Sequence, residues 1–221
     1  MARPQKFDTN TVLDQAMAVF WLKGYDDTSI QDLVDATGLN RGSLYNAFGD
    51  KAQLFAQVME HYKANSPARQ LVQAPEGTSP RTLIQDFLTA LVLRAQKDPD
   101  RKGCLITNTA AGLYGCDEAM NEWICNTLET LENVLTKVII LGQERSEITS
   151  ERDAQTLARF LVTTAQGINV IASSQVNLDH LSDVVDQVMW TLGDPDTITK
   201  PKNDTTDGNS LAFPSDPQHL Y

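Results

Sequence analysis

Three kinds of side chain in this sequence could carry chemistry: thiols, imidazoles, and a group of cations and amides near the N-terminus. The thiols and imidazoles belong to Cys104, Cys116, Cys125, His61, His180 and His219. Their spacing does not repeat in the way that zinc sites require. The sequence also lacks the phosphate-binding, metalloprotease and serine-hydrolase motifs. We therefore expect a protein that is not an enzyme, with no catalytic residue, no metal site and no cofactor.

Cys104 is the one thiol placed where it could react. It stands at the predicted beginning of a helix and directly follows Arg101, Lys102 and Gly103. A helix N-terminus and nearby cations both favour the reactive thiolate. The alternative is a buried and inert cysteine. Cys116 and Cys125 are interpreted as structural, because an odd number of cysteines in a reducing compartment indicates free thiols.

The cations and amides gather in the segment from Ser29 to Phe48, SIQDLVDATGLNRGSLYNAF. Two short helices are predicted on either side of a tight turn at Thr37-Gly38-Leu39, which is the pattern of a helix-turn-helix. The second helix carries small and polar residues outward, as entry into a DNA major groove requires. The candidate DNA-contacting residues are Thr28, Ser29, Arg41, Gly42, Ser43, Tyr45, Asn46 and Lys51.

Several of these residues have a specific expected role. Arg41 contacts a base or a phosphate, or is only a solvated charge. The hydroxyl of Tyr45 reaches a phosphate while its ring packs on the domain. Lys51 adds to the positive end of the next helix and suits a phosphate. Arg3 and Lys6 form a basic arm that touches DNA, or simply a flexible terminus.

The elements that must position these residues are helices throughout, because apolar residues recur at helical spacing and alternating strand patterns are scarce. Asp8, Asn40 and Asp50 are predicted N-caps, and Thr28 or Ser29 caps the helix between the first two. Residues 64–80 are rich in proline and polar residues and predict a loop. Further helices are expected at about 80–97, 103–114, 117–143, 151–173 and 179–192, with Ser150 and Asp153 approximating a capping box before the fourth of these.

Length and charge are compatible with this interpretation. The chain has 221 residues and a formal net charge of −11. Residues 1–65 hold six Lys/Arg against eight Asp/Glu, so most of the acidity lies further along the chain. Screening limits the reach of that distant charge to about 10 Å at ~0.1 M salt. With no membrane span and no signal peptide in the sequence, a cytoplasmic location is expected.

From Phe7 to about Tyr62 the sequence resembles the DNA-binding domain of the TetR/AcrR family of regulators. The matching residues are Ala16, Phe20, Gly24-Tyr25, Thr28-Ser29-Ile30, Ala36, Gly38, Gly42-Ser43-Leu44-Tyr45, Phe48, Lys51 and Leu54-Phe55. Gly49-Asp50 departs from the serine or arginine that many members carry before the lysine. The resemblance implies an all-α fold, a homodimer, and a repressor that releases operator DNA when it binds a small effector.

By the same resemblance the chain divides into a DNA-binding domain at 1–65, a helical sensing and dimerisation domain at 66–193, and a loosely attached tail at 194–221. Gly103-Cys104 resembles a subgroup of redox- and electrophile-responsive repressors. The candidate ligand-binding or sensing residues are Cys104, Asn108, Trp123, Phe87, Tyr62, Gln166 and Asn169. Aromatic residues at helical spacing are more often core, so the amides are the better pocket candidates.

Dimerisation is assigned to the helices at about 151–173 and 179–192. Each carries an apolar stripe that a monomer would leave partly exposed, and soluble proteins avoid large exposed patches. The stripes consist of Leu157, Leu161, Ala165 and Ile168 on one helix, and Leu181, Val185, Val188 and Leu192 on the other. The competing hypothesis is a helical adaptor that binds another protein and no DNA. It would explain the acidity, but not the polar Arg41-Gly42-Ser43 surface beside the turn.

Overall fold

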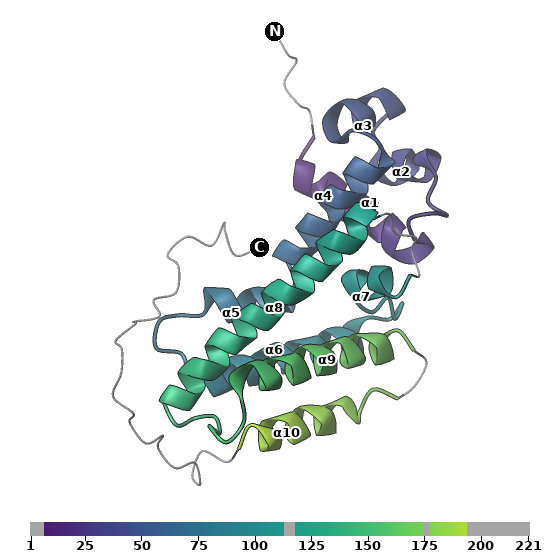
Figure 1. Cartoon of the computed structure of the whole chain (residues 1–221). Coiled ribbons are helices and arrows are strands. Elements are labelled where there is room, and N and C mark those ends of the chain that lie inside the picture. Colours follow the sequence, from purple (N-terminus) through teal and green to yellow (C-terminus); the bar gives the residue numbers. More distant parts are fainter. Residues whose placement is uncertain (1–6, 113–117, 175–176, 194–221) are drawn as a thin grey trace. The chain divides into compact units, whose positions relative to one another are not determined.

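The structure is a computed structural model that describes residues 7–112, 118–174 and 177–193, and within these ranges every regular element is a helix (Figure 1). The all-α prediction is confirmed. The predicted basic arm at Arg3 and Lys6, Cys116 and the tail at 194–221 lie outside the described residues. In the part of the chain that is described, no helix is long and apolar enough to cross a membrane.

Contacts divide the chain into two compact units, each of which combines two stretches of sequence. Unit 1 is Met1–Ser66 with Lys102–Ile124, and unit 2 is Pro67–Arg101 with Cys125–Tyr221. Residues 102–124, which were expected to belong to the C-terminal sensing domain, therefore group with the predicted DNA-binding helices. Each unit has its own architecture.

Unit 1 begins with four helices that are capped largely as the sequence predicts. They are α1 (Thr9–Lys23), α2 (Ile30–Thr37), α3 (Arg41–Phe48) and α4 (Lys51–Ala64). The side chains of Asp8, Ser29, Asn40 and Asp50 each accept a backbone N–H from the first turn that follows them. These caps satisfy N–H groups that have no partner inside the helix. Ser29, rather than Thr28, caps α2.

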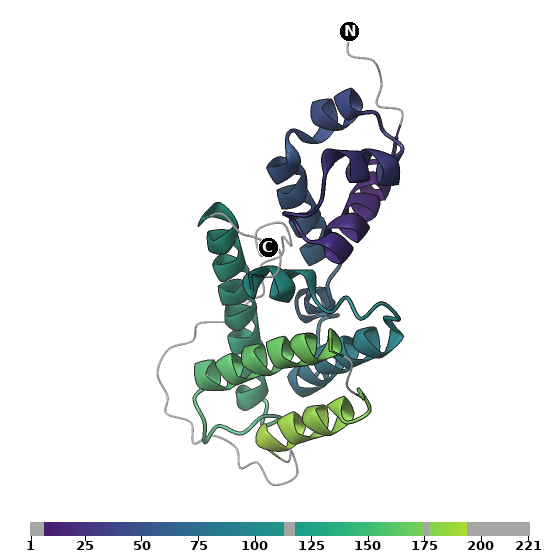
Figure 2. The same cartoon turned by 90° about the vertical axis from the view of Figure 1, so that its right-hand side faces the viewer.

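The four helices pack together in unit 1 (Figure 2), and buried aromatic and aliphatic side chains form their core. Phe20 is fully buried, and its ring meets the ring of Phe55 edge to face at a centroid distance of 4.9 Å. Leu33, Leu44 and Phe48 anchor α2 and α3 to the same core. Unit 1 is completed by α7 (Leu105–Ala110) and by the beginning of α8 (Glu118–Glu144).

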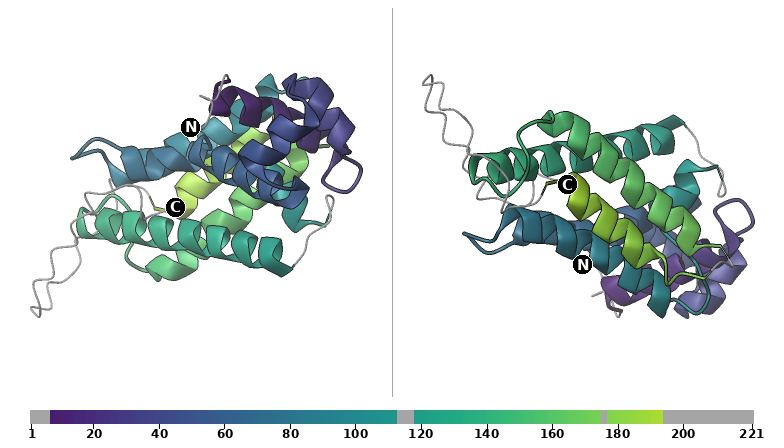
Figure 3. Two further views of the ribbon diagram at one scale, coloured as in Figure 1. Left: turned by 90° about the horizontal axis from the view of Figure 1, so that it is seen from above. Right: turned by 90° about the horizontal axis from the view of Figure 1, so that it is seen from below.

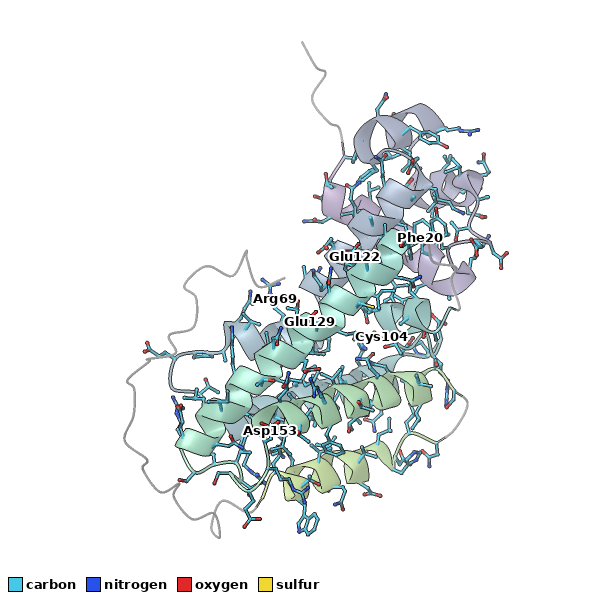
Figure 4. All side chains as sticks on the ribbon, in the orientation of Figure 1. Phe20, Arg69, Cys104, Glu122, Glu129 and Asp153 are labelled. Atoms are coloured by element: carbon cyan, nitrogen blue, oxygen red, sulfur yellow. The ribbon has the colours of Figure 1, made fainter. Side chains whose placement is uncertain are left out.

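Unit 2 contains η1 (Pro67–Arg69), α5 (Gln70–Gln73), α6 (Pro80–Lys97), the remainder of α8, α9 (Ala154–Ala172) and α10 (Leu181–Thr191). α6 contacts both α9 and α10 (Figure 3). The prediction of a loop at 64–80 is wrong for residues 67–73, where η1 and α5 form. Leu71 is buried in the core, which stabilises a helical turn there. Asp153 alone caps α9 (Figure 4), so the predicted Ser150 capping box is not formed.

The apolar stripes assigned to a dimer interface are instead the core of unit 2. All eight stripe residues are buried in the single chain, with Leu161, Leu181 and Leu192 at 0% exposure. α6 and α8 supply the facing surface through residues such as Leu88 and Leu135. The prediction that a monomer would expose these stripes is therefore wrong.

Candidate nucleic-acid interface

A tight turn joins α2 to α3, and its backbone conformation favours glycine. Gly38 ends α2 in the left-handed conformation, with φ +66°, and its N–H donates to the carbonyl of Val34. A residue with a side chain rarely adopts this conformation. Asn40 begins α3 two residues later, and its side chain accepts the N–H of Ser43 at 2.9 Å. The two helices therefore meet through a loop of minimal length, as a helix-turn-helix requires.

The helix α3 has one buried face and one free face. Leu44 and Phe48 are buried at 2% and 3% exposure, whereas Arg41, Gly42 and Asn46 are exposed. Ser43 and Tyr45 are half-buried at the edge between the two faces. The Arg41 guanidinium lies 5.5 Å from the centroid of the Tyr45 ring, which places the two side chains together on the free face.

A capping box and an ion pair fix the beginning of α2. The Ser29 hydroxyl accepts the N–H of Asp32, and the Asp32 carboxylate accepts the N–H of Ser29 at 2.9 Å. Lys23 donates to the same carboxylate at 2.6 Å. The Lys23 hydrogen bond and then the Ser29 N–H lower the pKa of Asp32 to about 2. The start of α2 is thereby linked to the end of α1.

Two residues predicted to contact DNA make internal contacts instead in the free chain. Thr28 is buried at 1% exposure, and its hydroxyl donates to the Gly24 carbonyl at 2.5 Å. Lys51 donates through Nζ to the carbonyls of Tyr25, Asp26 and Thr28. Both side chains thus hold the loop between α1 and α2.

Four of the predicted sensing residues lie in unit 1. Cys104 is 7% exposed and stands before α7 (Figure 4), where its Sγ accepts the N–H of Thr107 at 3.5 Å. Asn108 is buried and donates to the Lys102 carbonyl at 2.7 Å. The rings of Tyr62 and Trp21 meet edge to face with centroids 5.0 Å apart. Trp123 donates its indole N–H to the Glu60 carboxylate.

Phe87, Gln166 and Asn169 lie in unit 2 and are separate from that group. Phe87 is 2% exposed and belongs to the hydrophobic core. Asn169 is 5% exposed and accepts a hydrogen bond from Arg94 at 2.8 Å. Its buried amide thus has a partner within the chain, so its burial alone does not indicate a ligand.

The bonds of Lys51 and Trp123 were not anticipated from the sequence, and neither were three further contacts in unit 1. They are the Lys23–Asp32 pair, the His61–Asp14 pair at 2.7 Å, and the donation of the Trp21 indole to the Lys102 carbonyl at 3.0 Å. The capping box that holds Asp32 at the start of α2 could have been predicted from the spacing of Ser29 and Asp32. The His61–Asp14 and Trp21–Lys102 contacts connect residues 47 and 81 positions apart, and no local pattern predicts them.

In the described ranges no cluster of three metal-ligating side chains occurs.

Comparison with known proteins gives this geometry a context. Residues 12–58 match the N-terminal domain of the bacterial regulatory proteins of the tetR family, and residues 81–188 match the tetracyclin repressor-like C-terminal domain. The uncharacterized HTH-type transcriptional regulator YezE of Bacillus subtilis is 31% identical over 194 residues, which cover 87% of this chain and 100% of that protein. The HTH-type transcriptional repressor ComR of Escherichia coli is 31% identical over 187 residues, covering 82% of this chain and 87% of ComR.

A solved structure extends the likeness to the fold. A cysteine mutant of the TetR family transcriptional regulator CifR, complexed with 26-bp operator DNA, superposes with a TM-score of 0.73 at 27% identity, over 86% of this chain and 100% of that chain. The N-terminal family match covers the helix-turn-helix, and the C-terminal match covers most of unit 2 together with residues 102–124 of unit 1. The chain therefore belongs to the TetR family of bacterial transcriptional regulators, which is a family of DNA-binding proteins and not of enzymes.

Proposed function

We propose that this protein is a homodimeric transcriptional repressor that inserts α3 into the major groove of its operator and releases the operator when an effector acts on it. The observation that carries this proposal is the two-faced α3. Leu44 and Phe48 anchor it, while Arg41 and Asn46 remain exposed on a helix that Gly38 joins to α2. The operator complex of CifR and the repressor ComR support the same conclusion.

The free face of α3 supplies the contacts that read DNA. Arg41 and Asn46 have the donor groups that pair with guanine and adenine edges in the major groove. Gly42 is exposed on this face and adds no side chain to it, and the nearest atom that a Cβ there would meet is that of the Asn40 side chain at 3.5 Å, so the surface is open to DNA. Ser43 and the Tyr45 hydroxyl stand at the edge of this face, where phosphates would lie. Ser29, at the N-terminus of α2, offers a further phosphate site.

Fluorescence anisotropy with a labelled DNA from upstream of the gene tests this assignment. Replacing Arg41 or Asn46 by alanine is expected to weaken binding by about 1–3 kcal/mol per lost contact, or roughly 5–150-fold. Arg152→Ala is the matched control, because Arg152 is an exposed cation in unit 2. Unchanged affinity in the Arg41→Ala/Asn46→Ala double variant would show that α3 is not the reading helix, whereas a parent protein that does not bind the DNA would favour the adaptor hypothesis.

The dimer interface is proposed on the outer face of α9 together with α10. Phe160 and Val170 remain 40% and 53% exposed on α9, and Trp190 on α10 is 75% exposed. Thr163 and Gly167 complete one α9 face at helical spacing, and a Cβ on Gly167 would meet no atom within 4 Å. Such a surface lets a second helix approach closely. A second copy of this chain is the occupant that suits a twofold reader of paired half-sites.

The sensing element is proposed to be residues 102–124, because this segment belongs to the same compact unit as the reading helix. It is attached to α1 through Trp21 and Lys102, and to α4 through Trp123 and Glu60. A change at Cys104 would act on these attachments, since a group added to its buried Sγ must displace the N–H of Thr107. An effector releases DNA only to the extent that it binds the released state more tightly.

Thiol sensing can be tested separately from ligand binding. Cys104→Ser is expected to retain operator affinity and to lose release by N-ethylmaleimide. Cys125→Ser is the control, because Cys125 is an exposed free thiol, and this variant should still be released by N-ethylmaleimide through Cys104. If the Cys104→Ser protein is released as readily as the parent, the thiol is not the switch. A reversible ligand near Asn108, Trp123 or Tyr62, or near Phe87, Gln166 or Asn169 in unit 2, then becomes the better account.

A further inference from the structure

We infer that Lys51 serves operator binding by holding the loop in front of α2 in place, and not by contacting a DNA phosphate. This inference rests on the proposed function, in which α2 and α3 form the DNA-binding surface. The sequence predicts the opposite role for Lys51, because a cation at the first position of a helix suits a phosphate.

The ammonium group of Lys51 sits among backbone carbonyls. Nζ lies 2.7 Å from the carbonyl oxygen of Tyr25, 2.9 Å from that of Thr28 and 3.4 Å from that of Asp26. A lysine ammonium has three protons to donate, so these three acceptors can use all of them. The face of the Tyr25 ring covers the same cation, with Nζ 4.3 Å from the ring centroid. The acceptors and the ring all belong to a single loop, and the Lys51 residue is half-buried against it.

The loop from Tyr25 to Thr28 decides where α2 begins. It starts directly after Gly24, the C-cap of α1, and ends at Ser29, the N-cap of α2. The Tyr25 ring is itself wedged against the rings of Phe20 and Phe55, at centroid distances of 6.2 Å and 5.0 Å. Lys51 therefore joins the first turn of α4 to a loop that is 23 to 26 residues earlier in the chain.

A phosphate contact by Lys51 would have to compete with this arrangement. Nζ would need to give up at least one carbonyl, and that carbonyl would lose a charge-assisted hydrogen bond. Without Lys51 the loop retains the bonds from the Thr28 hydroxyl to the Gly24 carbonyl and from the Thr28 N–H to the Tyr25 carbonyl, but the carbonyls of Tyr25, Asp26 and Thr28 lose their charged donor. DNA would then have to order the loop during binding, which costs conformational entropy.

The salt dependence of binding separates the two roles. Each neutralised phosphate contributes about −0.9 to the slope of log affinity against log salt. Lys51→Met is expected to weaken operator binding by about tenfold, because the loop must be ordered on binding, while the slope stays within about 0.3 of the parent value. Hydrogen exchange of residues 24–30 in the DNA-free protein is expected to accelerate. Lys51→Arg should resemble Lys51→Met, since the cage fits a compact ammonium and not a planar guanidinium.

Tyr25→Leu is a second variant that removes no cation. It takes away the ring over Nζ and its packing on Phe20 and Phe55, so we expect weaker operator binding with an unchanged salt slope. Adding Lys51→Met to Tyr25→Leu should leave that slope unchanged, whereas a phosphate contact by Lys51 predicts that the added substitution flattens it. The inference is overturned if Lys51→Met flattens the slope by about 1.8 per dimer, if Lys51→Arg restores affinity, or if hydrogen exchange at 24–30 is unaltered. Circular dichroism at the assay temperature verifies folding, and should Lys51→Met be unfolded, Lys51→Arg decides, because a phosphate contact predicts parental affinity for it and the loop-holding role predicts a loss. A parent protein without operator binding would instead refute the proposed function.

Discussion

Phe160→Asp should dissociate the dimer while leaving each chain folded. Phe160 is 40% exposed on α9, and its neighbours Ala158 and Leu161 carry the packing of that helix against the core at 0% exposure. The substitution therefore places a charge on the outer face without opening a cavity. If that face meets a second copy, the carboxylate would be buried without a counter-charge, and removing the ring would forfeit apolar contact.

The loss of dimerisation free energy can be estimated from the area of the Phe160 side chain that is exposed in the single chain. A phenylalanine side chain buries about 200 Å² when fully enclosed, so about 80 Å² per chain and about 160 Å² per dimer are at stake. At about 25 cal/mol per Å² this area corresponds to ~4 kcal/mol. Association recovers only part of such a sum, and we expect about 2 kcal/mol, which is a roughly 30-fold rise in the dimer dissociation constant.

Sedimentation equilibrium over a range of micromolar concentrations measures this constant directly. Leu93→Asp is the matched control, because Leu93 is 44% exposed on α6 in the same unit and lies outside the proposed interface. Operator affinity should fall in Phe160→Asp and not in Leu93→Asp, since two linked reading helices are needed for paired half-sites. Equal dissociation constants for the parent and Phe160→Asp would refute the placement of the interface on this face.

Three further results are expected. Gly38→Ala should destabilise the folded state by about 1 kcal/mol in urea denaturation because of its positive φ, and Gly38→Asn by less; an equal loss would mean that backbone conformation is not the cause. Leu161→Ala should cost about 2–5 kcal/mol, whereas Thr163→Ala on the exposed side of α9 should change stability little; similar losses would contradict the observed burial. Asp32 has its pKa lowered to about 2, so its stabilising contribution is complete above about pH 4 and is lost as the pH falls through about 2. The urea midpoints of the parent and Asp32→Asn should accordingly converge toward pH 2, and a difference independent of pH would refute this.

Local chemistry made much of the helix-turn-helix and its flanking helices in unit 1 predictable from the sequence. The caps at Asp8, Asn40 and Asp50, the turn at Gly38, and the buried Leu44 and Phe48 were all expected, and each is observed. Such signals act over three or four residues, because a cap or a turn satisfies hydrogen bonds within its own segment. The family resemblance arises from the same stretch.

The function of an apolar stripe was not fixed by the sequence. Helical spacing shows that Leu157, Leu161 and Ile168 share a face, but the spacing is the same whether that face meets the same chain or a second one. α6 and α8 supply the missing surface within one chain, and only the folded structure shows this. The residues left exposed, including Phe160 and Val170, then become the candidates for contact between chains.

The sequence alone determined that this protein is all-helical, that a helix-turn-helix lies at its N-terminus and which residues face outward from the reading helix. Tertiary structure decided which groups accept hydrogen bonds from Lys51 and to which unit residues 102–124 belong. The physical reason is separation along the chain. A cap finds its partner a few residues away, whereas the acceptors of Lys51 lie 23 to 26 residues away and the Lys102 carbonyl lies 81 residues from the Trp21 indole. Contacts of that kind are set by the packing of helices against one another, which no local pattern encodes.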